Sequence, residues 1–351
     1  MLSRSALQIF LFLFLFSIAF ISCKKGDKNL QRSFYYWKSN EPSFDSTELK
    51  AIKHLNVKKL YVKFFEIENN RRYGVQPVSK TFINFNYSSN DSVKYFTEIV
   101  PVIFIKNEVL KNISKAGLDS LSDNILFLLT KKYKEQVDHE KSYQELQIDC
   151  DWTASTKDNY FFLLKALKKQ TKKLISCTLR LYPYKYPNLM GVPPVDRATL
   201  MCYNLNNPLE NENKNSILEV SELKKYLTRE TAYPLKLDFG LPINSWILCF
   251  QNNRFTGILH NQNGLTQIAV PEKALWFRVV RDTVINDIFL REGDKIKYEE
   301  VSEQQLKEAV KLLKKEVGIA GGATISFFHL DKNSLNRYSN ETLDYLYNSF
   351  E

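Results

Sequence analysis

The sequence predicts an α/β fold, a (β/α)8 TIM barrel with a small α+β insertion between strands 7 and 8. Eight short runs rich in Val, Ile, Phe, Tyr and Leu alternate with amphipathic helical segments, which is the order of elements in such a barrel. About 80 residues separate the seventh and eighth runs, and this interval contains further strand-like segments. A doubly wound open sheet is the alternative, but no glycine-rich phosphate loop occupies an early strand–helix turn.

The predicted strands are short, apolar and enriched in β-branched and aromatic residues, as buried strands are. They cover 34–39, 58–67, 98–105, 145–152, 174–182, 198–204, 235–242 and 321–330. Helical periodicity is found at 46–54, 118–137, 158–170, 222–230 and 303–318.

Polar residues mark the ends of several predicted helices. The expected N-terminal residues are Ser46, Ser155, Ser221 and Ser302. Two of these serines precede a polar partner three residues on, Asp158 and Gln305, which is the spacing of a capping box. Gly318 is expected to end the last of these helices.

The N-terminal segment is interpreted as a targeting signal. The apolar stretch 9–21 follows Arg4 and is shorter than the ~20 residues that span a bilayer, which is typical of a secretory signal. The Ser22-Cys23 sequence resembles the lipobox of bacterial lipoproteins, which implies cleavage before Cys23 and lipidation of this residue. Some Gram-negative lipoproteins carry an Asp retention signal directly after the lipidated cysteine. Here Lys24 follows Cys23, which favours the outer membrane. An ordinary cleaved signal with an unmodified cysteine is the alternative.

These observations divide the chain into four parts. We expect a signal peptide (1–22), a lipoprotein linker (23–33) and a TIM barrel (34–351), with an inserted subdomain at 251–317. The expected product is an exported monomer held in the bacterial cell envelope by its lipid anchor.

Charge and cysteine content limit the partners that we expect. The formal net charge is +10, but most lysines lie on the polar faces of predicted helices, so nucleic acid is not an expected partner. The four later cysteines stand singly in apolar runs and show no metal-ligand spacing. They are Cys150, Cys177, Cys202 and Cys249. We predict no metal and no cofactor.

Polar and aromatic residues gather near the carboxyl ends of the predicted strands, where the active sites of such barrels form. The candidate site residues are Glu66, Asp149, Asp151, Arg180, Tyr203, Asn204, Asp238 and Trp246. Carboxylates beside aromatic rings suit a glycan, because one acid can protonate a leaving oxygen while another stays ionised.

Four segments resemble the chitinase-type glycoside hydrolases (family eighteen). "ELQIDCDWT" (145–153) is similar to the fourth-strand motif D-x-x-D-x-D-x-E of that family, and "LMCYN" (200–204) is similar to the sixth-strand M-x-Y-D. "LKLDFGLPINSW" (235–246) and "AGGATISFFHLD" (320–331) resemble the seventh and eighth strands. The family also carries an α+β insertion between strands 7 and 8.

The resemblance implies roles for individual residues. Asp149 and Asp151 match the aspartates that orient the acid and position the substrate's N-acetyl group. Tyr203 matches the tyrosine that hydrogen-bonds this group, and Asn204 replaces the aspartate after it. Trp246 is expected to stack on a sugar.

The chain also departs from the family pattern. Thr153 stands where the family has its acid glutamate, and a threonine hydroxyl cannot protonate a leaving alcohol near neutral pH. Glu145 lies one residue away from the position of the leading aspartate, and Phe327 or Phe328 replaces the eighth-strand tryptophan. Chitinase activity by the family mechanism is therefore not expected.

Three hypotheses follow. In the first, the protein hydrolyses a glycan, with Asp151 as proton donor beside Asp149, and Glu66 or Asp238 as base or nucleophile. In the second, it is a catalytically silent glycan-binding lipoprotein. In the third, it is a structural envelope protein whose acids are paired with Arg180 and Lys63.

Overall fold

The structure is a computed structural model that describes most of the chain after residue 28. The described residues are 29–38, 43–78, 85, 95–96, 98–138, 142–209, 213–259, 265–285 and 288–351. The predicted signal peptide, Cys23 and the first part of the predicted linker lie outside these ranges. Within these ranges, no helix combines the length and the apolar character needed to cross a membrane.

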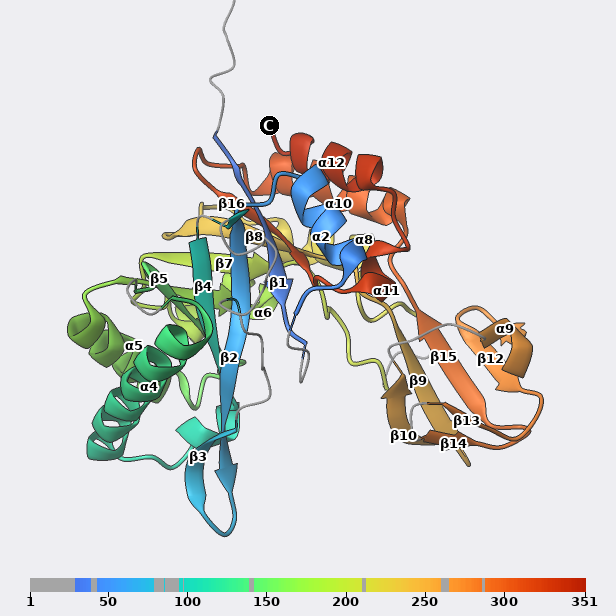
Figure 1. Cartoon of the computed structure of the whole chain (residues 1–351), viewed down its shortest axis with the longest axis horizontal. Helices are drawn as coiled ribbons and strands as arrows, with labels where there is room; N and C mark the ends of the chain where they lie inside the picture. Colours follow the sequence, from blue (N-terminus) through green and yellow to red (C-terminus); the bar gives the residue numbers. More distant parts are fainter. Residues whose placement is uncertain are drawn as a thin grey trace, which may run out of the picture.

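Eight parallel strands form a closed barrel, which confirms the predicted fold (Figure 1). They are β1 (Gln31–Tyr36), β2 (Lys59–Asn70), β4 (Glu98–Ile105), β5 (Glu145–Asp149), β6 (Leu174–Leu179), β7 (Arg197–Met201), β8 (Lys236–Pro242) and β16 (Thr324–Phe328). The barrel closes because β1 pairs in parallel with both β2 and β16.

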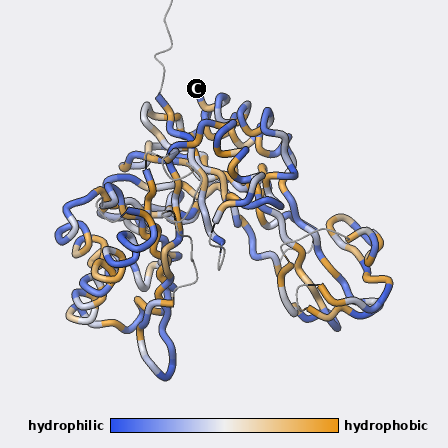
Figure 2. The backbone as a smooth tube through the Cα atoms, viewed as in Figure 1, coloured by the Kyte–Doolittle hydropathy of each residue, from blue (hydrophilic) through white to orange (hydrophobic). Residues whose placement is uncertain are grey.

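One strand continues beyond the barrel. The second half of β2 pairs antiparallel with β3 (Gly74–Val78), so the two form a hairpin that projects from the mouth end (Figure 1). Its tip is hydrophilic (Figure 2), and Gly74 at the turn has a positive φ of 73°, which glycine adopts without strain. The sequence did not predict this hairpin.

Helices cover the outer face of the barrel. The longer ones are α2 (Ser46–His54), α4 (Lys115–Gln136), α5 (Lys157–Thr171), α8 (Val220–Leu227), α10 (Glu303–Glu316) and α12 (Asn340–Asn348). Short helical segments are η1 (Asn107–Leu110), α6 (Leu181–Lys185), α7 (Pro187–Met190) and α11 (Lys332–Leu335). Aromatic contacts join the layers: Phe64 of β2 stacks on Tyr133 of α4, and Phe327 of β16 packs on Tyr347 of α12.

The residues at which the helices begin agree with the prediction at α10 but differ from it at α5 and α2. The capping box of Ser302 and Gln305 is confirmed at α10. The prediction for α5 was wrong, because the helix begins at Lys157 and Thr156, not Ser155, is its N-cap residue. At α2 the side chain of Asp45, one residue before the predicted start, accepts hydrogen bonds from two backbone N–H groups.

The chain segment between β8 and β16 forms a second sheet. Its strand order is β10–β9–β15–β12–β11, and a separate pair of strands, β13 and β14, lies beside it. The bounds are β9 (Trp246–Gln251), β10 (Arg254–Leu259), α9 (Leu265–Ile268), β11 (Ala269–Lys273), β12 (Trp276–Val279), β13 (Thr283–Ile285), β14 (Ile288–Leu290) and β15 (Lys295–Glu299). This insertion has its own apolar core and stands off from the barrel (Figure 1). Helix α10, which follows, packs on α8 and α12 of the barrel.

The barrel interior contains a buried ion pair near the amino ends of the strands. The Nζ atom of Lys59 lies 2.7 Å from Oε2 of Glu145, and both side chains are almost fully buried. Ser176 donates to the other oxygen of Glu145 at 2.5 Å. Glu98 lies 3.5 Å from Lys59 on the solvent side. Glu145, which the family resemblance set near the leading aspartate, therefore neutralises a lysine at the end of the barrel opposite the mouth.

Above this pair, uncharged polar groups continue the hydrogen bonds toward the middle of the barrel. The amide nitrogen of Gln147 donates to Thr199 at 3.1 Å, and its oxygen accepts from the hydroxyl of Tyr35 at 2.8 Å. Tyr35 stacks on Tyr61, with ring centroids 5.0 Å apart. Hydrogen-bonded polar side chains therefore fill the barrel from the Lys59–Glu145 pair to Gln147, and the aromatic rings of Tyr35 and Tyr61 lie above them.

We predict that the barrel depends on the Lys59–Glu145 pair. Lys59→Met should lower the unfolding free energy by about 3–5 kcal/mol, because it leaves a buried carboxylate without its cation. The double variant Lys59→Met/Glu145→Gln should recover part of this loss, since no charge then remains unpaired. Urea-induced unfolding followed by circular dichroism measures both effects.

The control is Lys307→Met on α10, which removes a half-exposed lysine paired with the exposed Glu303. Because solvent screens this pair, the unfolding midpoint should not change. A Lys59→Met midpoint equal to that of the wild type would contradict the prediction.

Candidate functional site

Asp149 is the last residue of β5 and faces the barrel interior at its mouth. It is in register with Phe104 of β4, which is in register with Glu66 of β2, so the three residues form one inward row. Thr178 of β6 donates a hydrogen bond to Oδ1 of Asp149 at 2.6 Å. Asp149 is thus a half-buried carboxyl that accepts a hydrogen bond from a neutral hydroxyl.

The environment of Asp149 favours its protonated form. Burial raises its pKa to about 6, although the Thr178 hydrogen bond opposes the shift. The negative charge of Asp151 raises the pKa further, while Arg180 and Lys63 lower it. A carboxyl with this pKa can hold or release a proton near neutral pH, as an acid catalyst must.

Asp151 has a different environment from Asp149. Its side chain is exposed, and its Oδ1 lies 2.9 Å from Nη1 of Arg180. Nη2 of Arg180 also donates to the backbone oxygen of Asn204 at 3.2 Å. Asp151, Arg180 and Asn204 thus connect the segments that follow β5, β6 and β7. The sequence assigned the proton donor to Asp151, but Asp149 is the more deeply buried acid.

Aromatic rings line the mouth beside Asp149. Phe328 stacks on Tyr203 with centroids 5.2 Å apart and an interplanar angle of 30°. Trp37 lies 6.0 Å from Phe328 on another side, and Tyr35 lies 6.2 Å away. Of the two phenylalanines that could replace the family tryptophan, Phe328 faces inward. Sequence reasoning placed Trp37 in the first predicted strand (34–39) but did not name it as a site residue; in the structure it directly follows β1.

Glu66 lies on the same inward row as Asp149 but two strands away. Strands about 4.8 Å apart separate their Cα atoms by roughly 10 Å. Oε2 of Glu66 is 3.7 Å from Nζ of Lys63, and both side chains are nearly buried. The same Nζ atom lies 5.4 Å from the ring centroid of Trp37. Lys63 therefore connects the carboxylate side of the mouth with the aromatic side.

The structure does not bring Asp238 to the mouth. Asp238 is near the amino end of β8, opposite Thr199, and accepts a hydrogen bond from the backbone N–H of Thr324 at 2.7 Å. Arg197 lies 3.3 Å from its carboxylate. Burial raises the pKa of Asp238 to about 6, and Arg197 opposes the shift. Sequence periodicity correctly indicates that the side chain of Asp238 points into the barrel. It does not show how far along the barrel axis the residue lies from the mouth.

Trp246 also lies away from the aromatic mouth. It begins β9 at the base of the insertion, and its indole Nε1 donates to Oε2 of Glu299 at 2.8 Å. Glu299 forms a fully buried ion pair with Lys297, with an N···O distance of 2.6 Å. Lys297 in turn donates to the backbone oxygen of Lys214 at 3.0 Å. Trp246 thus belongs to the junction between the insertion and the loop that precedes α8.

Thr153, at the position of the family's acid, belongs to a network of hydroxyl groups before α5. Its backbone N–H donates to Oγ1 of Thr156 at 2.9 Å, and its hydroxyl lies 2.9 Å from that of Ser155. Thr156 donates to Oδ1 of Asn107 at 2.6 Å. These contacts organise the loop and supply no acidic group. Among the described residues, no cluster of three His, Cys, Asp or Glu side chains could hold a metal ion.

No protein-family model matches the sequence, and the search of curated proteins finds no match either. The structural comparison does find similar folds. The spore cortex-lytic enzyme SleL of Bacillus cereus aligns with a TM-score of 0.51 and 14% identity, over 92% of this chain and 74% of that one. This likeness concerns the barrel fold alone.

Two further solved structures align less closely. A xylanase–α-amylase inhibitor protein in complex with trehalose has a TM-score of 0.48 and 10% identity, over 92% of this chain and 98% of that one. A tamarind chitinase-like lectin has a TM-score of 0.46 and 12% identity, over 90% of this chain and 98% of that one.

We predict that Asp149 makes stability depend on pH. Its pKa is near 3.9 in an unfolded chain and about 6 in the folded protein, so the folded state binds the proton more tightly. Its contribution is complete below about pH 4 and is lost as the pH rises through 6. Relative to Asp149→Asn, the wild type should therefore lose about 2–3 kcal/mol of unfolding free energy between about pH 4 and 7.

Urea unfolding of both proteins across this pH range measures the difference. Asp238 titrates in the same window in both proteins, so its contribution cancels. Parallel pH profiles for the wild type and Asp149→Asn would show that Asp149 has an ordinary pKa.

Proposed function

We propose that the barrel mouth binds a glycan. The observation that carries this proposal is the aromatic cluster of Trp37, Tyr203 and Phe328 at the mouth, where the half-buried carboxyl of Asp149 has a raised pKa. A sugar ring has an apolar C–H face that packs on aromatic rings, and hydroxyl groups that donate to carboxylates. Ligand sites combine apolar walls with a few fixed polar groups in this way.

The charged rim supports binding of hydroxyl groups. Asp151 is held by Arg180, which also contacts the backbone at Asn204. Glu66 is likewise held by Lys63. Because each carboxylate already faces a cation, its position is defined before a ligand arrives, and less conformational entropy is lost on binding.

Hydrolysis is a second candidate function, and the raised pKa of Asp149 favours it. Protonated Asp149 would donate its proton to the glycosidic oxygen as the bond to the anomeric carbon breaks. Water would attack that carbon, and Glu66 would accept the proton of the water. The two residues lie two strands apart with Phe104 between them. A separation of about 6.5–9.5 Å between their carboxyl groups would leave room for this water and give inversion.

We further propose that the protein is exported and held in the cell envelope, in the outer membrane, by a lipid on Cys23, and that it acts as a monomer. The apolar segment 9–21 and the Ser22-Cys23 sequence support this proposal. Only five residues separate Cys23 from Asn29, the first described residue. The lipid would therefore hold the barrel close to the membrane, with its amino-terminal strand ends toward the anchor.

We predict that Phe328→Ala weakens glycan binding by about tenfold or more, because it removes the centre of the aromatic cluster. Isothermal titration calorimetry with solubilised cell-wall glycan and with chitohexaose measures the affinity. The control is Phe289→Ala on β14, which removes an exposed phenylalanine of the insertion and should leave the affinity unchanged. Equal affinities for Phe328→Ala and the wild type, with both proteins folded, would exclude the mouth as the site.

The two candidate functions predict different outcomes for Asp149→Asn. If Asp149 is an acid catalyst, the wild type releases reducing ends from a bound glycan, and the variant is slower by about 10²–10⁴-fold. If the site only binds, neither protein forms product over days, while both retain affinity. Product formed at equal rates by both proteins would remove Asp149 from the mechanism.

Lipidation predicts that wild-type protein expressed in a bacterial host incorporates radiolabelled palmitate and sediments with membranes. Cys23→Ser should abolish both properties, because only the thiol of the mature N-terminal residue receives the lipid. Cys249→Ala, which alters a buried cysteine of the insertion, is the matched control and should keep the label. Label retained in Cys23→Ser would contradict the anchor.

A further inference from the structure

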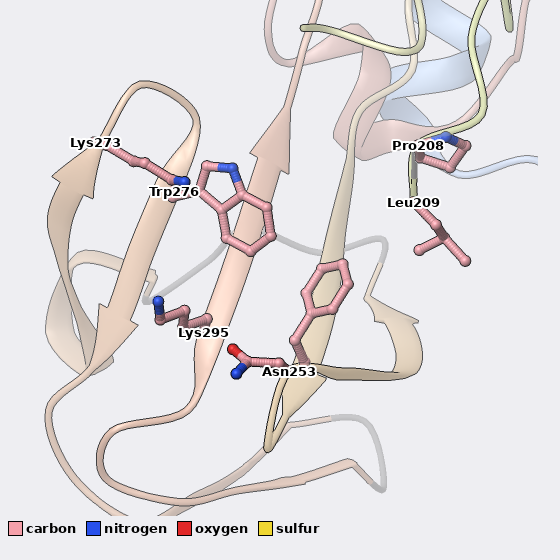
Figure 3. Close-up of a pocket in the computed structure, with 7 residues that line it drawn as sticks. Pro208, Leu209, Asn253, Lys273, Trp276 and Lys295 are labelled. Atoms are coloured by element: carbon pink, nitrogen blue, oxygen red, sulfur yellow. The ribbon is translucent and has the colours of Figure 1, made fainter. Parts of the chain in front are cut away.

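A second candidate site lies on the insertion. One face of its five-stranded sheet packs on the apolar core of the insertion, while the opposite face carries Trp276 and Lys295 (Figure 3). Phe250 of β9 is in register with Lys295 and lies on the same face. Pro208 and Leu209, from the loop between β7 and α8, stand opposite this face. The two sides enclose a cavity of about 160 Å³.

The cavity has the size of a small ring-shaped group. At ~30 Å³ for each water molecule in the liquid, it holds the volume of about five waters, which suits one sugar ring. Trp276 and Phe250 form its apolar side, with ring centroids 5.1 Å apart and tilted by 44°. Trp276 is only 7% exposed, so its position is fixed by packing. A fixed aromatic surface of this kind suits the apolar face of a sugar.

Positive charge gathers on the same face of the sheet. Lys295 of β15 lies directly opposite Arg278 of β12 in the antiparallel register, so both side chains point to one face. Lys273 of β11 brings a third cation, with its Nζ atom 5.3 Å from the ring centroid of Trp276. Like charges directly opposite one another destabilise a sheet, and a bound anion would relieve this repulsion.

Glu272 only partly offsets these charges. Its Oε1 atom lies 3.8 Å from Nζ of Lys295, and both side chains are about 40% exposed. Exposed ion pairs at this distance are weak because solvent screens them, so a ligand anion can displace Glu272 from Lys295. Asn253, whose φ is 59°, adds a neutral amide to the rim of the cavity.

We propose that this cleft binds an acidic sugar, with its ring against Trp276 and Phe250 and its carboxylate facing Lys295 and Arg278. The cleft is close to the barrel mouth. Five residue steps join Asn204 at the mouth to Leu209 at the cleft, which limits the separation of their Cα atoms to about 18 Å. A single glycan chain can span that distance. Binding of one glycan chain at both sites rests on the proposed function of the mouth. Binding at the cleft alone does not depend on that function.

The test compares two trisaccharides that differ only at C6. Cellouronic acid trisaccharide carries a carboxylate on each ring, and cellotriose carries a neutral hydroxymethyl group there. Isothermal titration calorimetry should show binding of the acidic trisaccharide, and weaker or no binding of the neutral one. Arg278→Gln/Lys295→Gln should lower the affinity for the acidic trisaccharide at least tenfold, because each charged contact is lost without altering the apolar side of the cleft.

A charge-matched variant separates this site from general attraction to a basic protein. Lys131→Gln/Lys311→Gln removes the same charge from exposed positions on α4 and α10 and should leave the affinity unchanged. Equal losses in the two double variants, or no binding of the acidic trisaccharide by the wild type, would overturn the proposal. Phe328→Ala tests the mouth separately, since it should reduce binding of the neutral glycan while the acidic trisaccharide still binds the cleft.

Discussion

The barrel depends on the pairing of Lys59 with Glu145. Their atoms are 2.7 Å apart in an interior from which water is largely excluded. A buried charge without a partner destabilises a fold by several kcal/mol, so each group requires the other. Ser176 completes the hydrogen bonds of Glu145, and Gln147 continues them toward Tyr35. Tyr35 in turn packs near Phe328. The aromatic rings of the mouth are thus positioned by a hydrogen-bonded column that begins with an ion pair at the far end of the barrel.

Asp149 and Asp238 show that a raised pKa alone does not identify a site. Burial raises the pKa of Asp149 and of Asp238 to about 6. Asp238 faces Arg197 and accepts a backbone hydrogen bond, which accounts for it as part of the interior packing. Asp149 accepts a bond from the neutral hydroxyl of Thr178 and lies where the strands open. Position in the barrel therefore distinguishes a candidate acid from a structural one.

The sequence predicted the barrel because strand and helix periodicities alternate strongly along the chain. It also placed Asp149 and Tyr203 on inward positions near strand ends, where the structure has them. It could not give the height of Asp238, since periodicity defines the face of a strand but not the register between strands. It could not choose between Phe327 and Phe328 because both faces of a barrel strand are buried, so an apolar residue fits either face. The sequence could not predict the site of Lys295 and Arg278. These residues are 17 positions apart and lie opposite each other only because β12 pairs antiparallel with β15.

The loop after β5 bears most directly on what the mouth can do. Thr153, Ser155 and Thr156 are bound to one another and, through Thr156, to Asn107 after β4. This network is satisfied by neutral hydroxyl groups and supports the start of α5. A carboxyl at position 153 would disrupt these bonds and add negative charge two residues beyond Asp151. The mouth therefore keeps its aromatic and carboxylate groups without an acid at position 153, and Asp149 is its half-buried acid whose pKa is raised to about 6.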